Sequence, residues 1–213
     1  MQAPSDMKTE VPAATAFTHW GTCPEPAMAT FVMRRFGDGH PTVTTAATKE
    51  PERIKILDIG AGAGAQTKWL IDEGFIAVPI DKSSEAMRRL MSRTRDLSVG
   101  IVGDITNLDK ISDDHFDCAV DVCCLQHLDY HQVRKALAEI RRVLKPGGWL
   151  FSMTANNNHS VTAFGDHFGR RESVSSVTML YTNAGFRMEP LREQFHTYTG
   201  LPVGHWIVEA QKP

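Results

Sequence analysis

Residues 54–64 read IKILDIGAGAG, and this stretch decides the fold. Four of its first six residues are β-branched or Leu, which is typical of a short buried strand. Gly60, Gly62 and Gly64 follow, and a helical pattern then runs over residues 65–73. A strand, a glycine-rich turn and a helix in this order build the ligand-binding edge of an α/β sheet. Glycine suits such a turn because it allows positive φ and lets a ligand approach bare backbone.

Strands and helices alternate along the rest of the chain. Periodicity and capping residues predict helices over 27–36, 65–73, 133–144 and 173–184, with another beginning at Ser83 or Ser84. The predicted strands are 54–59, 76–80, 99–102, 117–122, 149–153, 187–197 and 205–211. No helix separates the last two strands, which favours an antiparallel pair. The alternation before them predicts an α/β fold with a doubly wound, mostly parallel sheet.

Length and composition indicate one soluble globular domain. The chain has 213 residues, 42% hydrophobic and 23% charged, with a net charge of −2. We expect a polar tail, a cap helix and a linker over residues 1–53 and the main domain over 54–213. The near-neutral charge gives no electrostatic reason to expect nucleic acid as a partner. No signal peptide or membrane-length apolar run is visible, and four cysteines form no C-x-x-C pair, so we expect a cytoplasmic location.

Acidic residues follow the predicted strands near the glycine turn. Asp81 ends the second strand and Asp104 follows the third, while Asp58 precedes Gly60 by two residues. Residues 60–65 also fit the G-x-G-x-x-A pattern of nicotinamide- and flavin-binding folds. In such a fold, or in one that binds another adenosyl compound, Asp81 would accept hydrogen bonds from a ribose diol. A fixed acid at position 58 would repel a pyrophosphate at this turn, whereas it would attract a cationic ligand. This difference favours a positively charged adenosyl compound.

Five stretches in order then complete a family pattern. They are ILDIGAGAG (56–64), VPID (78–81), GDI (103–105), FDCAVDVCCLQHL (116–128) and RRVLKPGGWLFSM (141–153). Together they resemble the class I S-adenosylmethionine-dependent methyltransferases of small-molecule type. The resemblance implies a single Rossmann-like domain with seven strands, of which the last is antiparallel and inserted beside the fifth. It also implies S-adenosyl-L-methionine as the cofactor.

The resemblance assigns roles to individual residues of this chain. Gly60, Ala61 and Gly62 would line the methionine portion of the cofactor, with Asp58 facing its amino end. Asp81 would bind the ribose. The adenine would lie beside Lys82, Asp104 and Ile105, and the sulfonium and amino group nearest Asp121 and Val122. The family often has a small polar residue at the position of Asp121, so an acid there is a departure.

The acceptor side carries weaker signals. His127 follows the fourth strand and is the expected general base, and with Trp20 and Phe164 it would contact the acceptor. We expect a small, partly apolar acceptor, no metal, no membrane partner, and a monomer or homodimer. An RNA or protein acceptor, a nucleotide-dependent oxidoreductase and a non-catalytic binding module remain alternatives. Neither the acceptor nor the atom methylated follows from the sequence.

Overall fold

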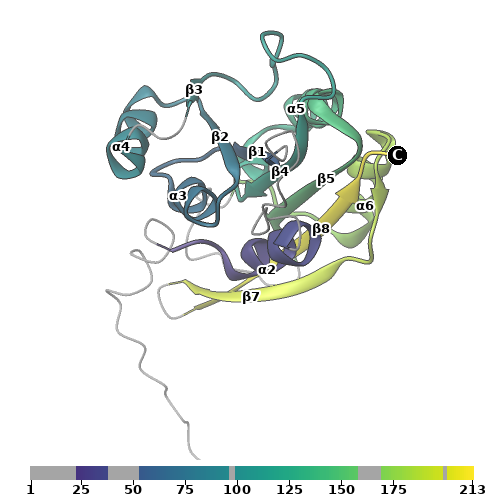
Figure 1. The fold of residues 1–213 in the computed structure, drawn as a ribbon. Helices are drawn as coiled ribbons and strands as arrows, with labels where there is room; N and C mark the ends of the chain where they lie inside the picture. Colours follow the sequence, from purple (N-terminus) through teal and green to yellow (C-terminus); the bar gives the residue numbers. More distant parts are fainter. Residues whose placement is uncertain (1–22, 38–52, 96–98, 158–168, 199–200) are drawn as a thin grey trace, which may run out of the picture.

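The computed structural model describes residues 23–37, 53–95, 99–157, 169–198 and 201–213. Within them the chain alternates strands and helices around one sheet (Figure 1). The helices are α2 (Pro26–Phe36), α3 (Ala65–Asp72), α4 (Ser84–Thr94), η2 (Leu125–His127), α5 (Tyr130–Val143) and α6 (Val174–Asn183). The strands are β1 (Lys55–Ile59), β2 (Ile76–Asp81), β3 (Ile101–Val102), β4 (Phe116–Val122), β5 (Leu144–Ala155), β6 (Arg187–Met188), β7 (Arg192–Tyr198) and β8 (Leu201–Gln211).

The sheet has the predicted doubly wound order. The described strands run β3-β2-β1-β4-β5-β8-β6, and the pairs from β3 to β5 are parallel. The last strand, β8, lies antiparallel to β5 and is inserted between β5 and β6, as expected. β7 extends this edge by forming a long antiparallel hairpin with β8. The reversal of strand order between β1 and β4 places a crevice at their carboxyl ends.

Several predicted boundaries were wrong. The strand predicted over 187–197 is two strands, β6 and β7, with Pro190 between them, because proline cannot donate to the ladder. β5 begins directly after α5 and runs through Lys145-Pro-Gly-Gly, with Gly147 at φ 78°, whereas we expected it to start at Trp149. α5 begins at Tyr130 because Asp129 and Gln132 form a capping box. β3 is shorter than predicted, only Ile101–Val102.

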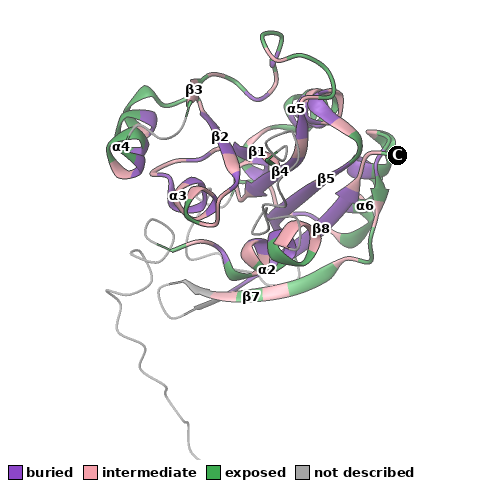
Figure 2. Cartoon of the chain, in the orientation of Figure 1, coloured by how far each residue is buried: buried purple, intermediate pink, exposed green. Residues whose placement is uncertain are grey.

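Two apolar cores cover the two faces of the sheet. On one face α2 and α3 pack on β1, β4, β5 and β8, with Phe31 against Phe151 at a ring-centroid distance of 5.4 Å. On the other face α5 and α6 contribute buried residues such as Leu137 and Val177. Figure 2 shows the central strands buried and much of β7 exposed. α2 is therefore part of the packed fold, and its partners include residues that end β4 and β5.

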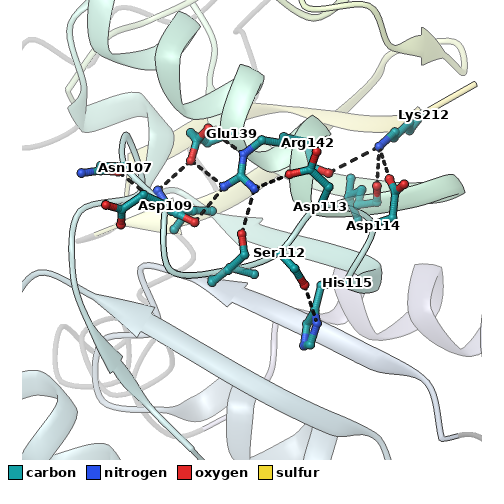
Figure 3. A network of polar contacts seen from close by, with 12 residues as sticks. Asn107, Asp109, Ser112, Asp113, Asp114, His115, Glu139, Arg142 and Lys212 are labelled. Atoms are coloured by element: carbon teal, nitrogen blue, oxygen red, sulfur yellow. Dashed lines mark hydrogen bonds and ion pairs between the residues drawn. The ribbon is translucent and has the colours of Figure 1, made fainter.

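The segment between β3 and β4 is fastened to α5 by Arg142. Its guanidinium donates to the carbonyls of Leu108 and Ile111 and to the carboxylates of Glu139 and Asp113 (Figure 3). These bonds raise the pKa of Arg142 and lower that of Glu139. The network fastens the middle and the end of the loop between β3 and β4 to α5.

Among the residues that the structure describes, no helix is long and apolar enough to cross a membrane. Cys118 is fully buried in the core on β4, as its position in a predicted strand indicated, and burial raises the pKa of its thiol.

Candidate functional site

A cavity of about 540 Å³ opens at the carboxyl edge of β1, β2, β3 and β4. Cavities of several hundred Å³ are the usual size for small-molecule sites. Its walls come from the glycine loop, the ends of β2 and β3, and the loop between β4 and α5. The lining residues are Gly60, Ile80, Asp81, Lys82, Gly103, Asp104, Ile105, Val122, Cys123, Cys124, His127, Leu128 and Gln132.

The glycine loop is fixed by backbone hydrogen bonds to β2. The amides of Gly60 and Ala61 donate to the carbonyl of Ile80 at 2.8 and 3.1 Å. Gly60 has φ 63°, and a Cβ there would lie 2.4 Å from the Cβ and Sγ of Cys124. Glycine is therefore required at this position twice, by backbone conformation and by space. The glycine loop therefore approaches the Cys124 side chain of the β4–α5 segment with bare backbone.

Two carboxylates stand on neighbouring strand ends. Asp81 Oδ2 accepts from the Gly62 amide at 2.9 Å, and its Oδ1 accepts from the Ser83 amide at 2.8 Å. Asp104 accepts from the Thr106 amide at 2.8 Å, and these hydrogen bonds hold the pKa of its carboxyl below the usual range. Each carboxylate oxygen has a second lone pair. Both groups thus remain able to accept hydrogen bonds from a ligand.

Two further acids lie buried beneath the cavity. Asp58 accepts from the Thr67 hydroxyl at 2.5 Å, and burial raises its pKa to about 7, with Asp121 and Asp81 adding repulsion. Asp121 accepts from Ser152 Oγ at 2.5 Å and from the amides of Cys124 and Leu125, and burial raises its pKa to about 6. Four acids in one region, two of them desolvated, favour a cationic ligand.

The β4–α5 loop is shaped by Asp121 and Gln126. Asp121 holds the turn in which Cys123 adopts φ 63°, an unusual conformation for a residue with a side chain. Gln126 is buried and its side-chain oxygen accepts from the Ala155 amide at 2.7 Å, which joins the ends of η2 and β5. His127 lines the cavity and keeps part of its surface exposed to solvent. The burial of the rest of its ring, together with the charge of Lys82, lowers its pKa.

The structure brings most of the predicted site residues to this cavity. Seven of them line it, namely Gly60, Asp81, Lys82, Asp104, Ile105, Val122 and His127. Asp58, Ala61, Gly62 and Asp121 do not line it. The Gly62 amide donates to Asp81, and the carboxylates of Asp58 and Asp121 accept from the Thr67 hydroxyl and the Cys124 amide. Trp20 and Phe164 fall outside the described residues.

Sequence reasoning missed the other side of the wall. Cys123, Cys124, Leu128 and Gln132 also line the cavity. Their place in the sequence could have indicated this role, because they follow Val122 directly and lead into the next helix. The whole β4–α5 segment, and not its first two residues alone, should be assigned to the edge of the sheet. No group of His, Cys, Asp or Glu among the described residues is arranged to hold a metal ion.

Comparison with known proteins gives one family match. Residues 57–152, just under half of the chain, match the family model described as a methyltransferase domain. The chain is 36% identical over 96 residues to a demethylmenaquinone methyltransferase of Paenarthrobacter aurescens (strain TC1). That match covers 45% of this chain and 36% of the relative, so it spans little more than a third of the relative's own length.

Two solved structures share the fold over most of the chain. A methyltransferase described as S-adenosylmethionine-dependent, from Methanosarcina mazei, aligns with a TM-score of 0.69 at 20% identity, covering 89% of this chain and 98% of that one. The 1,6-didemethyltoxoflavin-N1-methyltransferase of Burkholderia thailandensis, with bound 1,6-didemethyltoxoflavin and S-adenosylhomocysteine, aligns with a TM-score of 0.62 at 20% identity. It covers 89% of this chain and 91% of that one.

Proposed function

We propose that this chain, a class I S-adenosylmethionine-dependent methyltransferase by family and fold, transfers a methyl group from S-adenosyl-L-methionine to a small, partly apolar acceptor. The observation that carries the proposal is the cavity at the strand ends. Acids on β2 and β3, bare backbone on the glycine loop, and buried acids behind it suit a ligand that combines hydroxyls, an adenine and positive charge.

The cofactor's parts have matching partners in the cavity. Asp81 has lone pairs left to accept from a ribose diol, after the amides of Gly62 and Ser83. Asp104 and the backbone of Ile105 provide an acceptor and a donor for the edge of an adenine. Gly60 exposes backbone for the methionine portion. When bound, S-adenosylmethionine supplies an electrophilic methyl group.

The protein's remaining tasks are orientation and proton transfer. Asp121 and Gln126 fix the loop that forms the acceptor side of the cavity. Holding the acceptor in a reactive orientation lowers the activation free energy of methyl transfer. His127 is favoured as a neutral ring at pH 7 by its lowered pKa, so it remains a candidate general base. The apolar contacts expected from Trp20 and Phe164 remain predictions.

A small acceptor is supported by the comparisons. The relative from Paenarthrobacter aurescens is named for demethylmenaquinone, and the Burkholderia thailandensis enzyme is named for 1,6-didemethyltoxoflavin. Both names designate small-molecule methyltransferases. The chain's net charge of −2 adds no attraction for nucleic acid.

Two measurements test the proposal. Calorimetric titration with S-adenosylhomocysteine should show binding to one site, and absence of binding would refute the function. Methyl-tritiated S-adenosylmethionine incubated with the protein and a fractionated cell extract should then label a small-molecule fraction. Label in RNA or protein would contradict the acceptor class, and binding without any transfer would indicate a non-catalytic module.

A further inference from the structure

The short turn η2, which carries His127, is bound at both ends by charged side chains from outside it. Its own backbone hydrogen bonds are few: the amides of His127 and Leu128 donate to the carbonyls of Cys124 and Leu125. A single 3₁₀ turn of this kind has little stability of its own. Its position in the cavity wall therefore depends on the groups that bind its two ends.

Asp121 binds the beginning of the turn. Its Oδ1 accepts from the amides of Cys124 and Leu125 at 2.8 and 3.1 Å. The first amides of a helical turn have no partner within it, so a carboxylate acceptor suits them. This contact also keeps the Cys124 side chain against Gly60 of the glycine loop.

Arg170 binds the end of the turn. Its backbone amide donates to the Gln126 carbonyl at 2.6 Å, and its guanidinium donates to the carbonyls of Leu125 and Leu128. The last carbonyls of a helical turn carry partial negative charge, which favours a cation beside them. Arg170 does not line the cavity, whereas His127 and Leu128 do. Its effect on the cavity therefore passes through the turn that it binds.

The residue before Arg170 allows this close approach. Gly169 has φ 65°, and a Cβ at this position would collide with the carbonyl of Gln126. Only bare backbone fits there, so a glycine is needed for both conformation and space.

Glu172 fixes the orientation of the guanidinium. Its Oε1 accepts from Arg170 Nε at 2.6 Å, and its Oε2 accepts from the hydroxyls of Tyr130 and Ser176. The side chains of Arg170 and Glu172 are only 15% and 1% exposed. A buried ion pair adds little net stability, because both charges lose their hydration. Its planar, charge-assisted hydrogen bonds do fix the geometry of both groups.

Glu172 is itself tied to the sheet. Its amide donates to the carbonyl of Ala155 at 3.0 Å. Its carbonyl accepts from the amide of Asn157 at 3.1 Å and from the indole of Trp206 at 2.8 Å. A continuous set of hydrogen bonds thus runs from β5 and β8 through Glu172 and Arg170 to the cavity wall.

We propose that Arg170 is a positioning residue for methyl transfer, which holds residues 125–128 so that the acceptor side of the cavity faces the bound donor. This inference rests on the proposed function. Asp121 and Arg170 divide the task, because the first holds Cys124 at the glycine loop and the second holds the part of the turn that carries His127 and Leu128. Substitution of Arg170 should therefore disturb the acceptor side and leave the donor's site in place.

The first test needs neither cofactor nor acceptor. Hydrogen–deuterium exchange followed by mass spectrometry should show faster exchange over residues 124–128 in Arg170→Met than in the unsubstituted protein. Arg134→Met, at an exposed position on α5, is the matched control and should leave this exchange unchanged. Equal exchange in Arg170→Met and the control would overturn the proposal.

The second test separates position from charge. Burial raises the pKa of Asp121 to about 6 and the charge of Arg170 opposes this rise, so Arg170→Met also changes the field at Asp121. Arg170→Lys keeps a cation beside Glu172, so the buried carboxylate stays paired. An ammonium group lacks the planar fork that reaches Glu172 and two carbonyls together, so this variant changes geometry at constant charge.

Kinetics on Arg170→Lys then test the positioning role. With the extract fraction that accepts labelled methyl groups, the transfer rate at saturating S-adenosylmethionine should fall about tenfold to a hundredfold. The KM for S-adenosylmethionine and the affinity for S-adenosylhomocysteine should stay within about twofold. An unchanged rate, or a loss of S-adenosylhomocysteine affinity as large as the loss of rate, would refute the role of Arg170. Absence of S-adenosylhomocysteine binding by the unsubstituted protein would instead refute the methyltransferase function.

Discussion

At the scale of single residues, the site depends on acids in two different environments. Asp81 and Asp104 line the cavity and keep lone pairs free for a ligand. Asp58 and Asp121 are buried, and they bond Thr67 on α3 and the turn after β4. The first pair can recognise hydroxyls and amines directly. The second pair holds the backbone in place and adds negative potential beneath it. These two roles predict different results of substitution.

Replacing Asp81 should weaken cofactor binding without unfolding the protein. Hydrogen bonds to charged groups contribute about 1.5–3 kcal/mol, so Asp81→Ala should weaken S-adenosylhomocysteine binding about tenfold to a hundredfold. Asp81→Asn keeps one oxygen for the Gly62 amide, so its affinity should lie between those of Asp81→Ala and the unsubstituted protein. Calorimetry measures the affinity, and Asp109→Ala, an exposed acid in the β3–β4 segment, is the matched control. Equal affinities for Asp81→Ala and the control would refute the assignment.

Asp58 should make stability fall as the pH rises. Its pKa is raised from 3.8 to about 7 by burial, so between these values the folded state binds more protons than the unfolded state. The contribution of Asp58 to the free energy of unfolding therefore decreases from about pH 4 to pH 7, by at most about 1.4 kcal/mol per pH unit, and this contribution is constant above pH 7.

Urea denaturation across this pH range checks the effect. Asp58→Asn keeps an acceptor for the Thr67 hydroxyl and should gain stability over the unsubstituted protein as the pH rises to 7. Asp72→Asn, an exposed acid on α3, should not change the slope. Parallel pH curves for Asp58→Asn and the unsubstituted protein would contradict the burial argument.

At the scale of elements, the glycine loop follows β1 and contacts both β2 and the β4–α5 segment. Gly60 combines a positive φ with contact to Cys124, so it carries two separate constraints. Gly147 on β5 carries only the first, because it has φ 78° and nothing within 4 Å of a Cβ. The two positions therefore separate backbone strain from steric conflict.

We expect Gly60→Ala to destabilise the fold more than Gly147→Ala. The strain of a non-glycine residue at positive φ costs about 1–3 kcal/mol at either position. At Gly60 the added Cβ would also lie 2.4 Å from Cys124 and would displace this part of the cavity wall. S-adenosylhomocysteine affinity should therefore fall in Gly60→Ala and stay unchanged in Gly147→Ala. Thermal unfolding and calorimetry on both variants measure the difference. Two variants alike in both properties would show that the contact with Cys124 is unimportant.

At the scale of the whole molecule, local patterns predicted the sheet and the cavity side of the site. The glycine turn, Asp81 and Asp104 follow strands directly in sequence, so strand order alone brings them together. Asp121 lies at a strand end too, but its carboxylate bonds Ser152 on the neighbouring strand. The direction in which a side chain points at a strand end depends on tertiary packing, which cannot be predicted from the sequence pattern.

The hydrogen bonds of Arg170 to the turn after β4 could not be predicted from the sequence. Arg170 lies 45 residues after Leu125 and 42 after Leu128, and no local motif links them. They meet because Glu172 forms a parallel bridge with Asn156 beside the end of β5. Long-range register of this kind follows from the complete fold, not from periodicity.

The central claim is that the ends of β1, β2 and β3 form a binding site for a positively charged adenosyl donor. The most direct measurement is a crystal structure with S-adenosylmethionine. We predict that the ribose hydroxyls lie on Asp81, the adenine beside Asp104 and Ile105, and the methionine portion over Gly60. A donor bound elsewhere on the protein, or a cavity filled by the protein's own side chains, would contradict it.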